Sequence, residues 1–221
     1  MRRAVFLVGS VSFALIAACT APAEQAGGNN DALTDAVSDR PFAPDAPWPK
    51  FRRDMRQDGK SPIAPTRAPG QAPWSFRTGK GIFSTAVIDG AENIYIGSAD
   101  TYFYALDRKG ELRWKVKNEE IVDSSALLDD RGLVYYGAGD GYLRALETKD
   151  GSEVWRFAAA EPSTTGGFIK WFEGNVAIGP DGTLYVPNDN RHLYGIDRTT
   201  GKSKPGWPWL MNDQTWSLPA I

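Results

Sequence analysis

Hydrophobic and polar residues alternate along most of the chain between Ser84 and Trp209, in short stretches separated by turn residues. The clearest set of stretches reads STAVID (84–89), NIYIGS (93–98), TYFYALD (101–107) and ELRWKV (111–116). A period of two in segments of this length predicts β-strands, and the short Gly- and Asp-containing turns between them predict antiparallel hairpins. The sequence therefore predicts a sheet of four antiparallel strands in this region.

This four-strand pattern occurs three times along the chain. Tyr95, Tyr135 and Tyr185 lie at equivalent points of the three copies, and they are 40 and 50 residues apart. Repeats of this period are typical of β-propeller blades, because one small sheet cannot bury both of its faces alone. We therefore predict an all-β fold, a β-propeller of four-stranded antiparallel blades. The predicted blades are at about 84–122, 124–174 and 175–216.

The last five residues, SLPAI from position 217, align with the first strands of the earlier copies. They predict that the next blade begins at 217, so the propeller is incomplete, with about three full blades plus partial ones. Soluble proteins normally cover or close an open sheet edge. We interpret the chain as a truncated or partial gene product. An assembly that completes the ring and a four-bladed closure that uses the N-terminal segment as a strand are the alternatives.

Tryptophan recurs near the last strand of each copy. Trp74, Trp114 and Trp155 occupy corresponding places, and either Trp207 or Trp209 is the fourth member. A large flat side chain at a fixed place in every blade is best explained as packing on the neighbouring blade. We predict that Trp74, Trp114, Trp155 and Trp207 dock one blade on the next.

The second copy carries the most specific resemblance. Asp140-Gly141-Tyr142, followed by Ala145-Leu146-Glu147, Gly151 and Trp155, resembles the quinoprotein-type, or PQQ-like, propeller repeat. The resemblance covers residues 48–221 and implies a propeller held together by tryptophan docking. In the dehydrogenases with this repeat, a quinone lies in the central funnel beside calcium or a lanthanide. No metal ligands can be carried over from them to this chain, so we assign no cofactor, with PQQ and Ca²⁺ expected only if the chain is part of such an enzyme.

Other catalytic chemistry has little support in the sequence. Asp100, Asp140 and Asn190 recur at one hairpin, where a short polar side chain can accept hydrogen bonds from the N–H groups of the turn. A role as metal ligands is the alternative for these residues. The single histidine, His192, falls at a position used for packing in the other copies, so we expect it to be structural.

The N-terminus indicates export to the cell envelope. Two arginines precede an apolar run that is too short to span a bilayer as a helix, which is typical of a signal peptide over residues 1–18. The run ends in Ile-Ala-Ala-Cys19, which resembles a bacterial lipobox and implies lipidation of Cys19. A chance cysteine in an ordinary signal peptide, or a free buried thiol, is the alternative. We predict a disordered tether over 19–47 and the partial propeller over 48–221.

Charge argues against nucleic acid as a partner, since the basic residues are scattered among acidic ones and the formal net charge is −2. The chain also has an unusually long connection between its second and third copies. This connection contains Phe168, Trp171 and Phe172, which are a candidate loop for gripping a partner. Packing of these aromatic residues against their own blade is the alternative interpretation.

Three functions are compatible with these features. The first is a non-enzymatic, lipid-anchored propeller on the periplasmic side of the bacterial envelope, on the outer membrane, which acts as a scaffold for envelope proteins. It is similar to the lipoprotein propeller of the outer-membrane β-barrel assembly machinery. The second is the N-terminal part of a PQQ-dependent alcohol or sugar dehydrogenase. The third is a propeller that binds carbohydrate or another small ligand on the aromatic loop.

Overall fold

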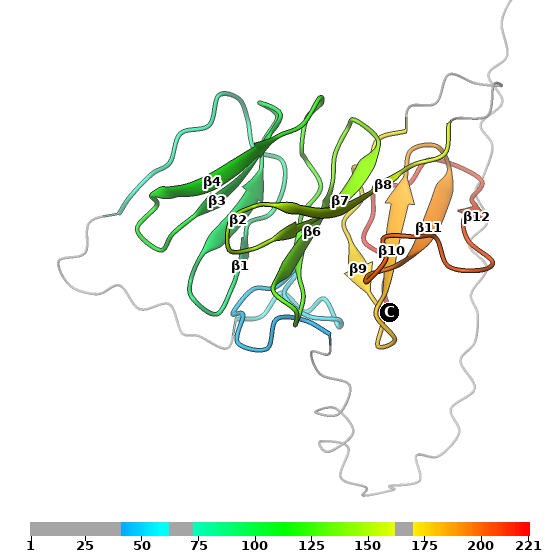
Figure 1. Cartoon of the computed structure of the whole chain (residues 1–221), viewed down its shortest axis with the longest axis horizontal. Helices are drawn as coiled ribbons and strands as arrows, with labels where there is room; N and C mark the ends of the chain where they lie inside the picture. The colour runs from blue at the N-terminus through cyan, green and yellow to red at the C-terminus, as the bar shows by residue number, and fades with distance from the viewer. Residues whose placement is uncertain (1–40, 62–72, 162–169) are drawn as a thin grey trace, which may run out of the picture.

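The computed structural model describes residues 41–61, 73–161 and 170–221, and within these ranges it contains twelve strands and no α-helix. The strands form three four-stranded antiparallel sheets that lie side by side like the blades of a fan (Figure 1). This confirms the prediction of an all-β fold with four-stranded blades. In the described part of the chain, no helix has the length and apolar character that a membrane crossing requires.

Each blade runs outward in chain order, from a short inner strand to an outer one. The first blade contains β1 (Val87–Ile88), β2 (Ile94–Gly97), β3 (Tyr102–Leu106) and β4 (Leu112–Lys117). The second contains β5 (Leu127–Leu128), β6 (Leu133–Gly137), β7 (Tyr142–Glu147) and β8 (Glu153–Ala158). The third contains β9 (Ala177–Ile178), β10 (Thr183–Asn188), β11 (His192–Asp197) and β12 (Trp209–Leu210).

Burial follows the position of each strand in its blade. All five residues of β6 are buried, whereas the outer strand β8 alternates between exposed and half-buried residues. β6 belongs to the middle blade and is covered by a blade on each face, which explains its continuous apolar sequence. The outer strand has charged residues at its exposed positions, which is usual for the edge of a sheet.

The hydrophobic core lies between adjacent blades. One buried cluster joins the first and second blades, where the rings of Phe103 and Tyr136 stack with centroids 4.0 Å apart. Another cluster joins the second and third blades, where Phe172 and Phe157 both contact the ring of Tyr194. Polar contacts reinforce this second interface, because the Arg198 guanidinium donates to the Asp130 carboxylate at 2.6 Å. Each blade is therefore stabilised by its neighbour.

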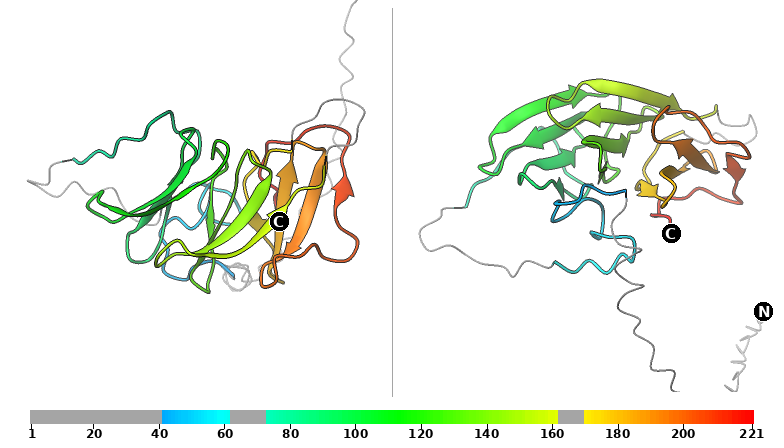
Figure 2. Two further views of the ribbon diagram at one scale, coloured as in Figure 1. Left: turned by 45° about the horizontal axis from the view of Figure 1, so that its top comes forward. Right: turned by 60° about the horizontal axis from the view of Figure 1, so that its bottom comes forward.

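Residues 41–61 run along the inner strands rather than forming a blade (Figure 2). Isolated bridges join Trp48 to Ile88 of the first blade and Lys50 to Leu127 of the second. Phe42 is buried in the core between the second and third blades. The predicted tether over 19–47 lies outside the described residues as far as residue 40. The last part of the predicted tether, 41–47, is packed, because the buried Phe42 anchors it. Its Pro- and Ala-rich composition nevertheless resembles that of a linker.

Candidate functional site

The predicted docking residues Trp114 and Trp155 each cover a turn of the following blade. The Nε1–H group of Trp114 donates to the Thr148 carbonyl oxygen at 3.1 Å, and that of Trp155 donates to the Arg198 carbonyl oxygen at 3.1 Å. Each indole also lies flat on a turn glycine with positive φ. A Cβ on Gly151 would come within 2.7 Å of the Trp114 ring, so only glycine permits this approach.

Trp74 and Trp207 occupy the two open sides of the fan. Trp74 lies on the turn of the first blade, where its Nε1–H group donates to the Arg108 carbonyl oxygen at 3.2 Å. Trp207 contacts Tyr185 of its own blade at 5.4 Å, as Trp155 contacts Tyr135 at 5.6 Å. In the described chain no further blade follows the third one, and the outer face of Trp207 is covered by a parallel stack with Trp209 at 4.5 Å.

The three aromatic residues of the candidate partner loop are placed differently. Phe168 lies outside the described residues. Trp171 is half-buried beside Gly139, and its carbonyl oxygen accepts a hydrogen bond from the backbone N–H of Asp189. Phe172 is fully buried in the core. The prediction that it contacts a partner is therefore wrong, and Phe172 is a packing residue. Trp171 and Phe172 therefore do not form a shared stacking platform.

Three carboxyl groups that the sequence analysis did not single out interact with one another, Asp123 before β5, Glu173 before β9 and Asp189 in the turn after β10. Burial raises the pKa values of Asp123 and Glu173, and the negative charge of Asp123 raises the pKa of Glu173 further. Burial, together with the charges of Glu173 and Asp123, raises the pKa of Asp189 to about 7, although a hydrogen bond from the Trp216 indole opposes this shift. Asp123 and Asp189 each have one carboxylate oxygen with no hydrogen-bond partner in the described chain. We call these three residues the axial acidic cluster.

The dehydrogenases with this fold use a metal ion. Among the described residues, the axial acidic cluster is where such an ion would be expected. Nowhere in the described ranges do three or more His, Cys, Asp or Glu residues meet in a geometry that could hold a metal. The described residues therefore offer no set of three such side chains to an ion of this kind. One signal in the sequence could have indicated the cluster, because Asp123 and Glu173 occupy the same position in consecutive repeats, just before the first strand.

The remaining candidate residues either make hydrogen bonds within their own turns or lie outside the described residues. Asp100 and Asp140 accept hydrogen bonds from turn N–H groups, those of Tyr102 and Tyr142, as the recurrence at a hairpin predicts. The Nδ1 atom of His192 lies 3.0 Å from the carbonyl oxygen of Asn190 in the same turn. Cys19 is among residues 1–40 and has no described position.

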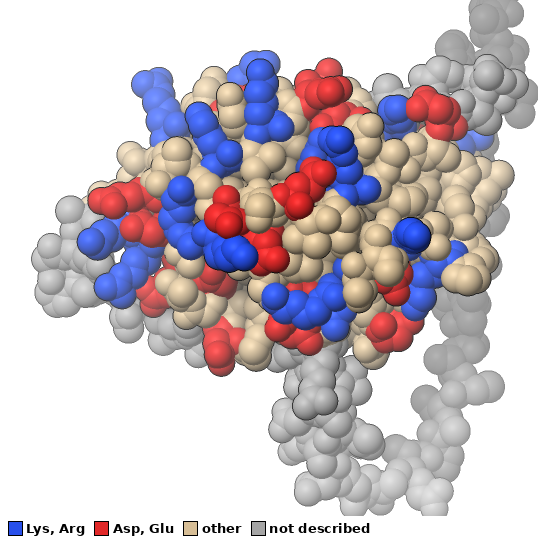
Figure 3. All heavy atoms as spheres, viewed as in Figure 1, with Lys and Arg blue, Asp and Glu red and all other residues tan. Residues whose placement is uncertain are grey.

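Surface charge differs between the blades on the face that Figure 3 shows. On the face shown in Figure 3, lysine and arginine alternate with acidic residues over the first two blades, whereas the surface over the third blade is mostly uncharged. Trp209, Leu210 and Trp216 are 59%, 74% and 62% exposed. We call Trp209, Leu210 and Trp216 the exposed apolar edge. Large exposed apolar side chains are frequent at protein contact sites.

Comparison with known sequences agrees with this architecture. The sequence model of the family described as "Outer membrane protein assembly factor BamB" matches residues 63–204. The chain belongs to this family. The BamB family model spans all three blades except the last strand, together with the Trp74 segment. No curated protein matches the chain significantly.

Solved structures show the same fold as this member of the BamB family. Quinohemoprotein alcohol dehydrogenase from Comamonas testosteroni is 21% identical, with a TM-score of 0.60 over 83% of this chain and 29% of its own. The related enzyme ADHIIG from Pseudomonas putida HK5 is 19% identical, with a TM-score of 0.56 over 71% of this chain and 25% of its own. A europium-containing methanol dehydrogenase is 18% identical, with a TM-score of 0.60 over 82% and 34%. At such identities the likeness shows the PQQ-like propeller fold, and this chain spans about a third or less of each protein.

Proposed function

We propose that this chain is a non-enzymatic, lipid-anchored scaffold of the bacterial envelope, which binds other proteins during assembly of the outer membrane. Its membership of the BamB family, whose description names an outer membrane protein assembly factor, supports this class of function. The observation that carries the proposal is the exposed apolar edge of the third blade. Trp209 and Leu210 stand on an edge strand whose neighbouring residues, Gly206 to Met211, include no charge, unlike β4 and β8.

The anchor is proposed from the sequence alone. A diacylated Cys19 gains about 0.8 kcal/mol for each methylene group buried in lipid, which holds the domain on the periplasmic side of a membrane. The mass of the mature protein from its native cell tests this proposal. A mass that begins at Cys19 and includes acyl chains supports it, whereas a mass that includes residues 1–18 contradicts it.

Deletion of the gene tests the scaffold role. We expect less folded β-barrel protein in the outer membrane, measured by heat-modifiable migration of a major barrel on gels. The unaltered gene should restore the barrel, whereas a Trp209→Ser, Leu210→Ser variant should not. Leu112→Ser is the matched control, because Leu112 is also exposed but lies on β4. Normal barrel levels in the deletion strain would reject the scaffold proposal.

A quinone-dependent dehydrogenase is the alternative function, because the solved structures with the same fold include two quinohemoprotein alcohol dehydrogenases. The described residues offer no chelating set, so we expect no turnover when PQQ, Ca²⁺ and an alcohol or sugar are supplied with a redox dye. Dye reduction that depends on both PQQ and Ca²⁺ would favour the enzyme over the scaffold.

A further inference from the structure

The outer strand of each blade has one edge that faces away from its own sheet. β4 pairs with β3 and β8 pairs with β7, and in the described part of the chain neither outer strand pairs with a further strand. This edge lies on the rim of the fan, whereas adjacent blades contact one another through the faces of their sheets (Figure 1). The rim therefore stays accessible whatever the number of blades in the propeller.

The hydrogen-bond pattern shows which residues of β4 present their backbone groups at the rim. The Asn118 N–H group donates to the Thr101 carbonyl oxygen at 2.8 Å, so this opposite pair is hydrogen-bonded. Bonded and non-bonded pairs alternate along an antiparallel ladder. Lys115 and Lys117 therefore lie at non-bonded positions and direct their N–H and C=O groups away from β3. We call residues 113–117 the basic rim edge.

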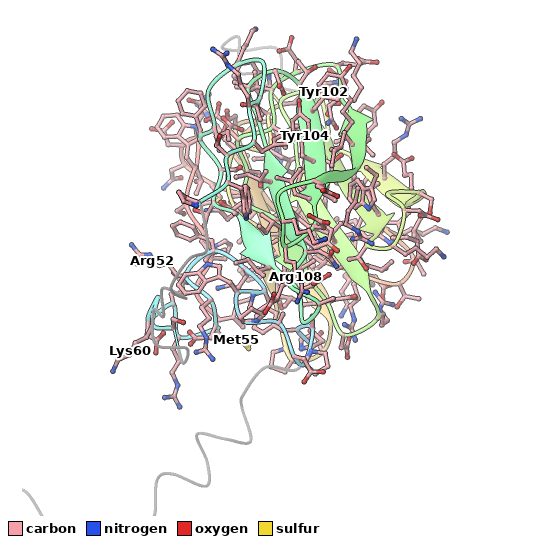
Figure 4. All side chains as sticks on the ribbon, turned by 90° about the vertical axis from the view of Figure 1, so that its left-hand side faces the viewer. Arg52, Met55, Lys60, Tyr102, Tyr104 and Arg108 are labelled. Atoms are coloured by element: carbon pink, nitrogen blue, oxygen red, sulfur yellow. The ribbon has the colours of Figure 1, made fainter. Side chains whose placement is uncertain are left out.

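The side chains of these two lysines lie on the face of β4 that points away from the second blade. Trp114 and Val116 pack against the cluster between the first and second blades, and successive side chains of a strand alternate between its faces. The Lys115 ammonium lies 4.4 Å from the centroid of the Tyr102 ring, which Figure 4 labels. Both lysines are exposed, and neither forms an ion pair with a described residue.

The equivalent face of the second blade carries a different charge pattern. Arg156 takes the place of Lys115 there and lies 3.6 Å from the Glu153 carboxylate. Ala158 takes the place of the second lysine. In the first blade, Leu112, which is outside the basic rim edge, stands where the second blade has the glutamate. The first blade therefore carries two positive charges without an acidic partner at this face.

A neighbouring blade does not cover these positions. Arg156 and Ala158 are exposed although the first blade packs against their side of the second. A blade beside the first would leave the two lysines exposed in the same way. The segment 73–78 already lies on that side of the first blade, with the ring of Phe76 5.4 Å from that of Tyr104, and both lysines remain exposed.

We propose that the basic rim edge accepts an extended acidic segment of a partner protein, which pairs antiparallel with β4 and places carboxylates opposite Lys115 and Lys117. This inference rests on the proposed scaffold function and adds to it a contact separate from the exposed apolar edge. The free main-chain groups supply affinity. The lysines supply selectivity, because opposite charges directly across a strand pair are favourable, whereas lysines at an edge oppose apolar and basic strands.

The spacing of the lysines defines the partner segment. Lys115 and Lys117 are two residues apart on one face, so the segment carries Glu or Asp at two positions separated by one residue. The intervening residue lies on the other face, beside the half-buried Val116, and is apolar. Such a segment favours β4 over β8, where Arg156 already has an acidic neighbour and Ala158 has no charge.

Peptide binding tests the inference. The probes are two labelled peptides of one composition, Thr-Glu-Val-Glu-Val-Thr and Thr-Glu-Glu-Val-Val-Thr, titrated onto the full chain by fluorescence anisotropy. Only the first presents both carboxylates on one side of a strand, so we expect it to bind saturably and about tenfold more tightly than the second. Added salt should weaken the binding, since the charges are exposed.

Methylation of the peptide nitrogen atoms tests for strand pairing. The glutamates of the first peptide lie opposite the lysines, so their N–H groups bond to the lysine carbonyl oxygens. N-methylation of both glutamates should weaken binding about 30-fold through loss of two hydrogen bonds, whereas N-methylation of both valines should leave it unchanged.

Protein variants locate the binding edge. A double variant, Lys115→Gln with Lys117→Gln, should weaken binding of the first peptide about tenfold. Lys149→Gln with Lys202→Gln is the matched control, because it removes the same charge from exposed lysines in turns after β7 and β11. Near-UV circular dichroism checks that both variants fold. In the unaltered chain, the bound peptide should slow amide hydrogen exchange in β4 and leave β8 unchanged.

Four outcomes overturn the inference: no saturable binding, equal affinity for the two peptides, equal loss in both methylated forms, or equal loss in both double variants. Absence of peptide binding together with slow exchange of the Lys115 and Lys117 amides in the free protein would assign the edge to another segment of the same chain. Binding to phosphatidylglycerol vesicles but to neither peptide, lost in the Lys115→Gln, Lys117→Gln variant, would assign it to a lipid surface.

These measurements do not depend on barrel assembly in cells. Loss of the scaffold function in the gene deletion and loss of peptide binding at the basic rim edge are separate results. Failure of this inference is therefore distinguishable from failure of the scaffold proposal.

Discussion

Phe172 fills a core position at the interface of the second and third blades, while Trp171 beside it is only half-buried. Truncation of a fully buried phenylalanine leaves a cavity and typically costs 3–5 kcal/mol. We expect Phe172→Ala to lower the free energy of unfolding by about this amount, and Trp171→Ala to lower it by less than half as much. Urea denaturation measures both. Equal losses would mean that the packing described for Phe172 is wrong.

Asp189 should make stability depend on pH. Its pKa is raised to about 7, first by burial and then by the charges of Glu173 and Asp123, whereas an unfolded aspartate titrates near 3.9. The folded state therefore binds the proton more tightly, and this contribution to stability is complete below about pH 4 and is lost as the pH rises through about 7.

The expected measurement is a fall in the Tm of the unaltered chain between pH 5 and pH 8, by roughly 5–10 °C. Asp189→Asn should flatten this decline, because the amide does not titrate. Asp213→Asn, in an exposed carboxyl group of the C-terminal segment, should leave the decline in place. A decline of equal size in all three proteins would assign the pH dependence to other groups.

Among the elements, the turn under each docking tryptophan is constrained twice, by a positive φ and by contact with the indole. Gly151 has a φ of 75° and touches the Trp114 ring, whereas Gly206 has a φ of 83° with no atom within 4 Å of its Cβ position. Both Gly→Ala variants incur the backbone cost of positive φ, of order 1 kcal/mol. Only Gly151→Ala also displaces an indole, which typically costs a further 1–3 kcal/mol.

We therefore expect Gly151→Ala to be about 1–3 kcal/mol less stable than Gly206→Ala in urea denaturation. The same comparison can be made through Trp114 fluorescence, which should shift to longer wavelength only in Gly151→Ala. If the two variants are equally stable, the indole does not constrain the turn.

The strands themselves could be predicted from the sequence, because short stretches rich in apolar residues are bounded by turn residues, although only some strands, such as β2, show period-two burial. The predicted stretch 101–107 contains β3, and 111–116 overlaps β4. The environment of residues between the strands could not be predicted in this way. Phe42 and Phe172 lie in segments without periodicity, and their burial depends on which blades happen to meet there.

The axial acidic cluster could not be predicted from the sequence, for a related reason. Asp123 and Glu173 share a repeat position, so their proximity could follow from the repeat. Asp189 comes instead from the turn after β10, and its interaction with the other two depends on how adjacent blades pack together. The packing of tryptophans on neighbouring blades could be predicted from the repeat. A site built from different repeat positions could not, because it depends on how the blades are arranged next to one another.

At the scale of the whole molecule, residues 41–61 join blades that otherwise touch only their immediate neighbours. Trp48 pairs with Ile88 in the first blade, Lys50 pairs with Leu127 in the second, and Phe42 packs in the cluster that includes Ile178 of the third. In a repeat protein, stability is approximately a sum of nearest-neighbour terms. A segment that crosses all three inner strands adds coupling between blades that are not adjacent.

Phe42→Ala should reveal this coupling. The buried ring is expected to contribute about 3–5 kcal/mol, and its loss should increase amide hydrogen exchange in β5 of the second blade and β9 of the third together. Leu112→Ala, in an exposed side chain of β4, is the control and should change exchange only near its own position. Faster exchange confined to residues 41–61 in Phe42→Ala would show that the segment rests on the blades without stabilising them. Faster exchange in both blades would mean that a stretch with the composition of a linker is part of the folded unit.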